Sequence, residues 1–227
     1  MRAALFCLAL FAAVSCCAED LRVQVRIVHE KNPRETSNAN VVVWLTPVSG
    51  VVKTPPPLEH IRLVQKNKEF TPHLLAITAG TSVEFPNEDP FFHNVFSLYK
   101  GKRFDLGLYE AGSSRSVKFD RPGVSFIFCN IHPDMSATVI ALPTPYFAVS
   151  KANGETIIRN LPDGKYKMEV WYERSTPEAL QKLTSEISVP ASREVVVEVR
   201  ELVPDKVPHK NKYGQDYDKN NPYGTQP

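Results

Sequence analysis

Cysteine is scarce in this sequence, and three of its four cysteines lie within the first 17 residues. If the N-terminal segment is removed after Ala18, a single cysteine remains, Cys129. One thiol cannot form a disulfide within its own chain, so a disulfide framework is excluded. Exported compartments oxidise free thiols. We therefore expect Cys129 to be reactive, to pair between molecules or to be protected by a bound group.

A strong charge of one sign is also missing. The chain has 27 Lys and Arg against 25 Asp and Glu, a net charge of +2. Residues 1–18 contribute only Arg2, so their removal leaves 26 basic and 25 acidic residues, a net charge of +1. No basic stretch alternates with aromatic residues, so the sequence indicates no nucleic-acid partner.

Glycine is outnumbered by proline, 10 against 19, while hydrophobic residues make up 42% of the chain. This hydrophobic content is enough for a packed core. Val, Thr, Phe and Tyr recur in short runs, which favours strands and turns over long helices. We expect an all-β protein.

Long apolar runs are absent except at the N-terminus, where Arg2 precedes an apolar stretch over residues 3–14 and small residues up to Ala18. This order is typical of a secretory signal peptide over residues 1–18, although a membrane anchor or a buried strand is an alternative. The sequence AVSC at 13–16 also resembles a lipoprotein processing site, which would place a lipid anchor on Cys16. We expect a periplasmic or extracellular protein with no transmembrane segment after cleavage.

The candidate chemistry lies in segment 129–135, which reads CNIHPDM and follows a predicted strand. It offers a thiolate from Cys129, an imidazole from His132 and a thioether from Met135. A second imidazole, His93, lies upstream in DPFFHNV. Two histidines, one cysteine and a weak axial methionine form the ligand set of a type 1 (blue) copper site.

Each of these residues also has an ordinary structural explanation. A lone methionine usually fills a core, a lone histidine is usually structural or exposed, and a buried thiol can be inert. The four together, in a β-domain without another cysteine, favour one bound copper ion.

Residues 60–142 resemble the cupredoxins, close to the plastocyanin and amicyanin group. The resemblance is carried by FTP at 70–72, GTSVEFPN at 80–87, HNV at 93–95 and the strand from 123 to 129. The Cys-x-x-His-Pro-x-Met spacing is most similar to that of amicyanin. The resemblance implies a Greek-key β-sandwich. It covers about 80 of the 227 residues, a length suited to one small sandwich domain.

The resemblance also implies a role for each site residue. His93, Cys129 and His132 would be equatorial ligands and Met135 the axial one. The amide of Asn94 would donate to the cysteine sulfur. Pro133 has no amide hydrogen for a second such bond, which by itself should lower the reduction potential.

Near the solvent-facing ligand His132, the resemblance implies an apolar docking patch that includes Phe91, Phe92 and Pro133. Asp134 stands where the family usually has an apolar residue, which puts the hydrophobicity of that patch, and hence the kind of partner, in doubt. The other histidines, at positions 29, 60, 73 and 209, have no partner at metal-ligand spacing, and we interpret them as structural or exposed.

The segments on either side resemble the early and late strands of a carboxypeptidase-regulatory-like or transthyretin-like sandwich. Neither has enough strands alone, but together they offer about seven. We expect residues 19–53 and 144–203 to form one discontinuous sandwich, with a cupredoxin domain at 58–143 inserted through linkers near 54–57 and 143–145. The alternative is one enlarged cupredoxin. Residues 204–227 lack periodicity and predict a flexible tail.

Three functions agree with these features. The chain could transfer single electrons in the cell envelope with an unknown redox protein as partner, deliver or store copper, or act as a structural or recognition module with an incidental metal. No His-x-His pair for a trinuclear copper centre is present, and four protein ligands leave no open position for a substrate. We therefore expect an electron carrier and not an enzyme.

Overall fold

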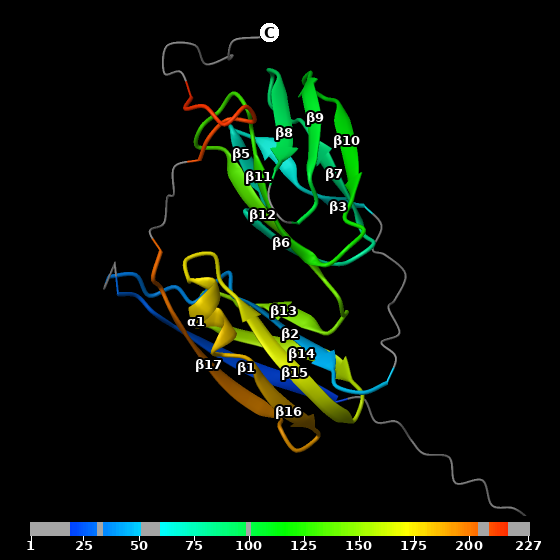
Figure 1. The fold of residues 1–227 in the computed structure, drawn as a ribbon, viewed down its shortest axis with the longest axis vertical. Helices are drawn as coiled ribbons and strands as arrows, with labels where there is room; N and C mark the ends of the chain where they lie inside the picture. The colour runs from blue at the N-terminus through cyan, green and yellow to red at the C-terminus, as the bar shows by residue number, and fades with distance from the viewer. Residues whose placement is uncertain (1–18, 31–33, 51–59, 99–100, 204–208, 218–227) are drawn as a thin grey trace, which may run out of the picture.

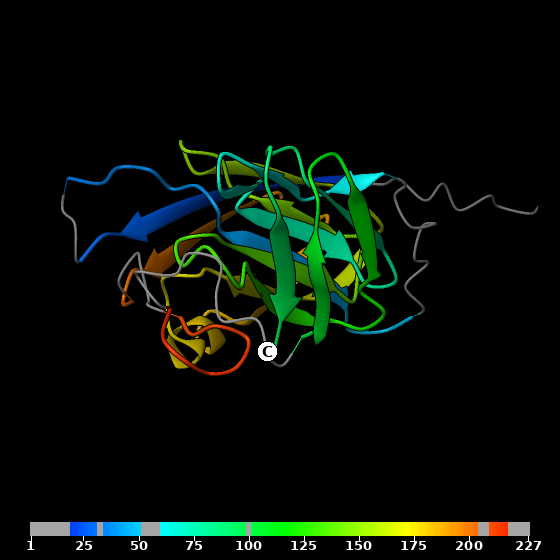
Figure 2. The ribbon, with the colours of Figure 1, turned by 90° about the horizontal axis from the view of Figure 1, so that it is seen from above.

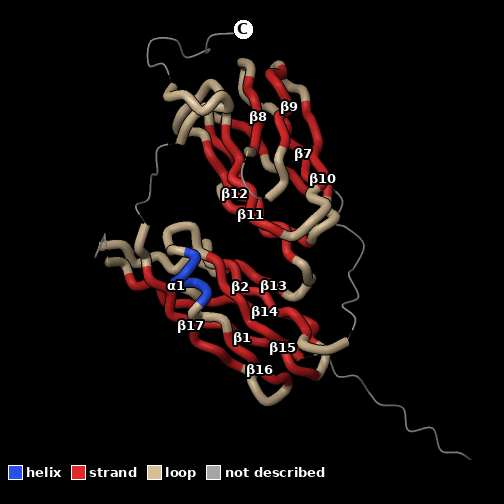
Figure 3. The backbone as a smooth tube through the Cα atoms, viewed as in Figure 1, coloured by secondary structure: helices blue, strands red, loops and turns tan. Residues whose placement is uncertain are grey.

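A computed structural model of the chain describes residues 19–30, 34–50, 60–98, 101–203 and 209–217. Within them the chain forms seventeen strands and one short helix, which confirms the predicted all-β fold class (Figures 1 and 3). The predicted signal segment, the lipid-anchor candidate Cys16 and the linker at 54–57 lie outside the described residues. The helix found among the described residues is too short to cross a membrane.

Strands from both ends of the chain form one sandwich, called here the flanking sandwich. Its two sheets have the orders β14-β1-β17 and β13-β2-β15-β16. The strands are β1 (Glu19–Val28), β2 (Val42–Pro47), β13 (Phe147–Val149), β14 (Glu155–Leu161), β15 (Gly164–Trp171), β16 (Ser185–Val189) and β17 (Glu194–Arg200).

The strands between β2 and β13 form a second body, called here the inserted sandwich. Its main sheets have the orders β6-β12-β11-β8-β9 and β10-β7-β3, and β4 pairs with β5. The strands are β3 (Ile61–Arg62), β4 (Val64–Lys66), β5 (Glu69–Thr71), β6 (Leu74–Thr78), β7 (Ser82–Pro86), β8 (His93–Ser97), β9 (Phe104–Tyr109), β10 (Ser114–Lys118), β11 (Gly123–Phe128) and β12 (Ser136–Leu142). In the order of the chain, the inserted sandwich therefore lies between strands β2 and β13 of the flanking sandwich.

The alternation of side chains along β2 explains how the bodies are joined. Val43 and Leu45 point into the core of the flanking sandwich, whereas Val42 and Trp44 point to the opposite face and belong to a separate apolar cluster. Successive residues of a strand face opposite sides of the sheet. Because both faces of β2 are apolar, its sheet has a core on each side.

Strand β12 shows the same double burial in the inserted sandwich. Ala137, Val139 and Ala141 join the core around the candidate ligands, while Ile140 and Leu142 join the cluster that contains Val42. The molecule is thus a stack of four main sheets with three apolar layers between them, and Figure 2 shows the inserted sandwich lying over the flanking one.

The middle layer, called here the inter-sandwich layer, contains both tryptophans of the chain. A polar bridge lies beside it. The carboxylate of Glu173, which follows β15, accepts from His73 Nε2 over 2.6 Å and from the Thr138 hydroxyl over 3.0 Å. The members of the layer are Val42, Trp44, Leu74, Ala76, Val124, Ile140, Leu142, Phe147, Val149 and Trp171.

The helix α1 (Pro177–Gln181) begins at a Thr-Pro pair, which suits a helix start. The Thr176 hydroxyl accepts from the backbone N–H of Ala179 over 3.3 Å and so caps the first turn, and Pro177 occupies a position where a missing N–H costs nothing. The turn closes the path from β15 to β16.

Candidate metal centre

The loop that joins β11 to β12 carries three of the four predicted ligands. Its backbone is closed by two hydrogen bonds of 3.1 Å, from the N–H of Cys129 to the C=O of Met135 and from the N–H of Met135 to the C=O of His132. The two strands pair in antiparallel fashion up to the loop. The loop is therefore the tip of a hairpin, and its backbone fixes the starting points of these three side chains.

The fourth predicted ligand reaches the loop through the topology of the sheet. His93 is the first residue of β8, and β8 lies next to β11 in the five-stranded sheet. Its Nδ1 lies 3.7 Å from the Cys129 sulfur, and Nδ1 of His132 lies 3.4 Å from the same atom. The candidate ligand atoms of all three residues lie within 4.8 Å of one another.

These separations agree with one ion held by all three residues. Metal bonds of about 2.3 Å to sulfur and about 2.0–2.1 Å to nitrogen, as found for zinc, place the two ligand atoms about 3.5–3.8 Å apart at tetrahedral to trigonal angles. The observed sulfur-to-nitrogen distances are 3.7 and 3.4 Å. Met135 is fully buried in the core cluster that also contains Cys129. The donor set therefore fits a thiophilic metal such as copper.

Asp89, which the sequence analysis did not single out, fixes the orientation of His93. Its carboxylate lies 2.8 Å from His93 Nε2. A carboxylate accepts, so Nε2 carries the hydrogen and Nδ1 keeps a free lone pair directed at the sulfur. Asp89 is itself held by the backbone N–H groups of Asn67 and Lys68 over 2.6 and 2.9 Å.

A buried amide shapes the turn that carries Asp89. The side chain of Asn87 donates to the C=O of Phe91 over 2.8 Å and accepts from the N–H of Asp89 over 3.1 Å. Phe91 in turn lies against both imidazoles, with ring centroids 5.2 Å from His93 and 5.7 Å from His132. The turn at residues 87–91, which precedes β8, therefore packs against both histidine rings.

Burial sets the protonation of the three candidate ligands. It lowers the pKa of His93, against the opposing effect of Asp89, and with the neighbouring His93 it lowers the pKa of His132 to about 4. Both imidazoles are therefore neutral at pH 7, as metal binding requires. Burial raises the pKa of the Cys129 thiol, so a metal ion must displace its proton.

The cysteine sulfur has more hydrogen-bond donors than the sequence predicts. The backbone N–H of Asn94 contacts it, and so do the N–H groups of Ile131 and His132, all of which favour the thiolate. Pro133 supplies none. The two additional donors withdraw charge from the sulfur and oppose the low-potential effect that we expected from Pro133.

The surface next to His132 matches the predicted patch in part. Phe92 is 55% exposed, and Pro133 and Asp134 are also exposed. Phe91 is only half-buried but turns inward against the imidazoles. The exposed surface beside the partly buried His132 is therefore made of one aromatic ring, a proline and a carboxylate.

The remaining histidines lie outside this site. Nδ1 of His29 donates to the Glu201 carboxylate over 2.6 Å, His73 contacts Glu173, and His60 lies 3.8 Å from Glu84. His209 stacks on Phe128. Among the described residues, His93, Cys129 and His132 form the one cluster of this kind that could hold a metal ion.

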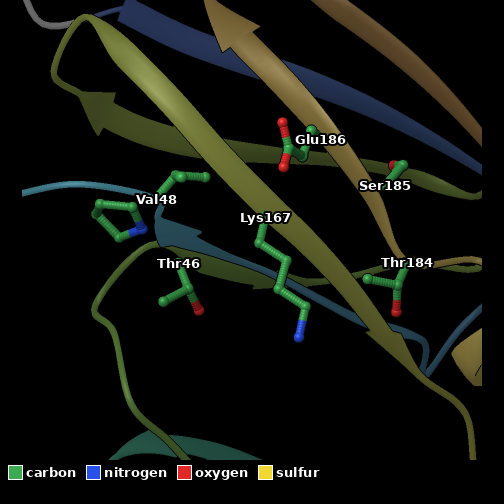
Figure 4. A pocket seen from close by; sticks show the side chains of 7 residues that line it. Thr46, Val48, Lys167, Thr184, Ser185 and Glu186 are labelled. Carbon is green, nitrogen blue, oxygen red and sulfur yellow. The ribbon is translucent and has the colours of Figure 1, made fainter.

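Two hollows lie elsewhere on the surface. One, of about 420 Å³, lies on the flanking sandwich between β2, β15 and β16 (Figure 4). Its lysine, Lys167, is already paired with Glu169 over 2.8 Å, and its lining has neither histidine nor cysteine. The other is a groove of about 990 Å³ between the sandwiches that reaches Pro133 and Asp134 of the ligand loop.

No known protein-family profile and no curated protein match this sequence. Among solved structures, the chain is similar to a purple cupredoxin from Nitrosopumilus maritimus (26% identity, TM-score 0.33, covering 37% of this chain and 98% of that chain). It is similar to amicyanin from Paracoccus versutus (22%, TM-score 0.34, covering 43% and 97%). It is also similar to a Cu-containing nitrite reductase from Thermus scotoductus SA-01 (24%, TM-score 0.36, covering 51% and 28%). We infer the function from the geometry of the site itself.

Proposed function

We propose that this chain is an exported one-electron carrier that holds a single type 1 copper ion. The ligands would be His93, Cys129, His132 and Met135. The observation that supports this most directly is the convergence of two imidazole Nδ1 atoms on one thiol sulfur, at 3.7 and 3.4 Å. A buried thioether in the same core completes the donor set of blue copper sites.

When bound, copper supplies exchange of one electron between Cu(II) and Cu(I). The residues of the chain supply the fixed surroundings. Asp89 holds the His93 ring in one tautomer, and three backbone N–H groups stabilise the thiolate of Cys129. Phe91 lies against both imidazoles, which keeps water from the buried side of the site. Ligands held in this way need little movement when the charge changes.

The burial of the site favours a carrier over a delivery protein. Cys129, His93 and Met135 are fully buried, so release of the metal requires the loop to open. Four protein ligands would leave no coordination position for a substrate, so we propose a carrier and not an enzyme. Phe92 and Pro133 beside His132 offer the surface on which a redox protein would dock. Export is proposed from the N-terminal sequence alone.

The test is titration of the purified apoprotein with Cu(II), followed by visible absorption and EPR. An intense blue sulfur-to-copper band with narrow hyperfine splitting is expected at one equivalent. Both should be lost in Cys129→Ser and His93→Gln. A protein that binds copper without this band would refute the type 1 site and favour delivery or storage, or an incidental metal on a structural module.

A matched control comes from the second histidine–carboxylate pair. His73 contacts Glu173 over 2.6 Å, much as His93 contacts Asp89 over 2.8 Å. His73 is about half-exposed whereas His93 is buried, so His73→Gln should disturb the structure less than His93→Gln and leave the blue band unchanged. Loss of the band in both variants would mean that the effect comes from general unfolding.

A further inference from the structure

Residues 209–217 fold over the loop at 129–135, called here the ligand loop, instead of extending into solvent. The sequence predicts a flexible tail from residue 204 onwards, whereas the structure places this segment, red in Figure 1, against the inserted sandwich. We call it the C-terminal strap. A turn within it is closed by its own hydrogen bonds, from the N–H of Gln215 and of Tyr213 to the side-chain oxygen of Asn211 over 3.0 Å each.

One end of the strap holds the backbone of the candidate cysteine ligand. The hydroxyl of Tyr217 donates to the C=O of Cys129 over 2.7 Å. The N–H of Lys212 donates to the side-chain oxygen of the next residue, Asn130, over 2.9 Å. Burial raises the pKa of Tyr217, so the phenol keeps its hydrogen at neutral pH.

The other end covers the aromatic residue that precedes the cysteine. The ring of His209 lies on Phe128 with centroids 4.1 Å apart and an interplanar angle of 32°. The Tyr217 ring meets His209 edge to face at 5.2 Å. The strap therefore fixes positions 128, 129 and 130 together, at the point where β11 enters the ligand loop.

A second arm reaches the sulfur through a chain of hydrogen bonds. The ammonium of Lys212 contacts Asp105 over 2.8 Å, and the other oxygen of Asp105 accepts from the side chain of Asn94 over 2.7 Å. The backbone N–H of Asn94 contacts the Cys129 sulfur. Lys212 thus supports Asn94 through Asp105, while Tyr217 supports the backbone of Cys129 itself.

We infer that the C-terminal strap is a positioning element of the metal site, with Tyr217 and Lys212 as its positioning residues. It holds the Cys129 loop and the Asn94 amide in the arrangement that a metal ion needs, and it keeps solvent and other reactants from the sulfur. The part that concerns the metal rests on the proposed function. The part that concerns access to Cys129 does not.

The decisive measurement is the rate at which iodoacetamide alkylates Cys129 in the full-length apoprotein, read by mass spectrometry of the peptide that contains it. Tyr217→Phe should raise this rate about fivefold, the factor that corresponds to about 1 kcal/mol for one lost hydrogen bond. A chain ending at residue 208 should show a larger increase, with the far-ultraviolet circular dichroism spectrum unchanged, which shows that the strands remain folded.

The controls remove the same groups elsewhere. Tyr166→Phe deletes a phenol that donates to the C=O of Pro162 over 2.6 Å in the flanking sandwich. Lys102→Met breaks a pair with Asp120 of 3.0 Å, for comparison with Lys212→Met. Both controls should leave the Cys129 alkylation rate within about twofold of wild type, inside the range expected for a remote substitution. Equal rates in wild type, Tyr217→Phe and the truncated chain would overturn the inference.

The loaded protein provides a second readout. Tyr217→Phe and Lys212→Met should speed the transfer of copper to a Cu(I) chelator and shift the sulfur-to-copper band, whereas Tyr166→Phe should do neither. If the wild type takes up no copper, the proposed function fails while the alkylation rates still decide the role of the strap. If copper binds and the alkylation rates are equal, only the strap inference fails.

Discussion

Replacing Ile140 with alanine tests whether the inter-sandwich layer is a true core. Ile140 is 2% exposed and belongs to the cluster between the two sandwiches. The change removes three carbons, each worth about 0.8 kcal/mol of transfer free energy. A cavity contribution follows if the sheets cannot close the gap. We therefore expect a loss of about 2–5 kcal/mol in the free energy of unfolding.

Three further isoleucines calibrate the result. Ile77 and Ile158 are buried in the cores of the inserted and flanking sandwiches, and their replacement by alanine should cost a similar amount. Ile157 is 38% exposed, and Ile157→Ala should cost less than about 1 kcal/mol. Urea unfolding followed by tryptophan fluorescence suits the question, because both tryptophans lie in the layer.

The shape of the transition gives a second outcome. A core shared by both sandwiches makes them unfold together, so wild type should show one transition by fluorescence and circular dichroism. Ile140→Ala should separate the transitions or broaden them. A loss below about 1 kcal/mol for Ile140→Ala, beside normal losses for Ile77→Ala and Ile158→Ala, would refute the shared core.

Three other predictions follow from the site and its surroundings. Burial alone would raise the pKa of Glu173, but hydrogen bonds from His73 and a threonine hydroxyl hold it below its ordinary value. The ionised carboxylate therefore stabilises the fold above the unfolded pKa of about 4.3, and this stabilisation is lost as the pH falls through the lower, folded pKa. In urea unfolding, the loss of unfolding free energy caused by Glu173→Gln should therefore shrink from pH 7 to pH 3. A loss that stays constant over this range would contradict the prediction. Gly101→Ala should lower stability by about 1–3 kcal/mol in thermal unfolding, because its Cβ would overlap the C=O of Val124. Copper at 100 times its dissociation constant should stabilise wild type by about 2.7 kcal/mol in calorimetry, and Cys129→Ser should lose that gain.

The parts of the site that are local in sequence could be predicted from it. Cys129, His132 and Met135 lie in one hairpin loop, so their spacing already limits how far apart they can be. His93 lies 36 residues earlier, and only its similarity to a family motif placed it beside the loop. The sequence suggested an insertion because neither flank has enough strands to bury its apolar faces alone.

The missing parts depend on contacts that no local pattern encodes. Asp89 contacts His93 from four residues away, but the intervening turn is built by Asn87 and not by a helix. Tyr217 reaches Cys129 across 88 residues. The pairing of β8 with β9 contains a register shift between Asn94 and Phe96, which the sequence pattern does not mark. The near-continuous apolar run of β12 was a usable signal for burial on both faces.

The pairing of β2 with β13 shows how the inserted sandwich is attached to the flanking sandwich. Phe147 of β13 lies opposite Trp44 of β2 in an antiparallel ladder, the arrangement that a short turn makes in an ordinary hairpin. The whole inserted sandwich occupies the place of that turn, and the sheet of the flanking sandwich holds both of its attachment points. The C-terminal strap, however, follows β17 of the flanking sandwich in the chain. Moving the inserted sandwich alone into another protein would therefore transfer the four candidate ligands without the strap that supports them.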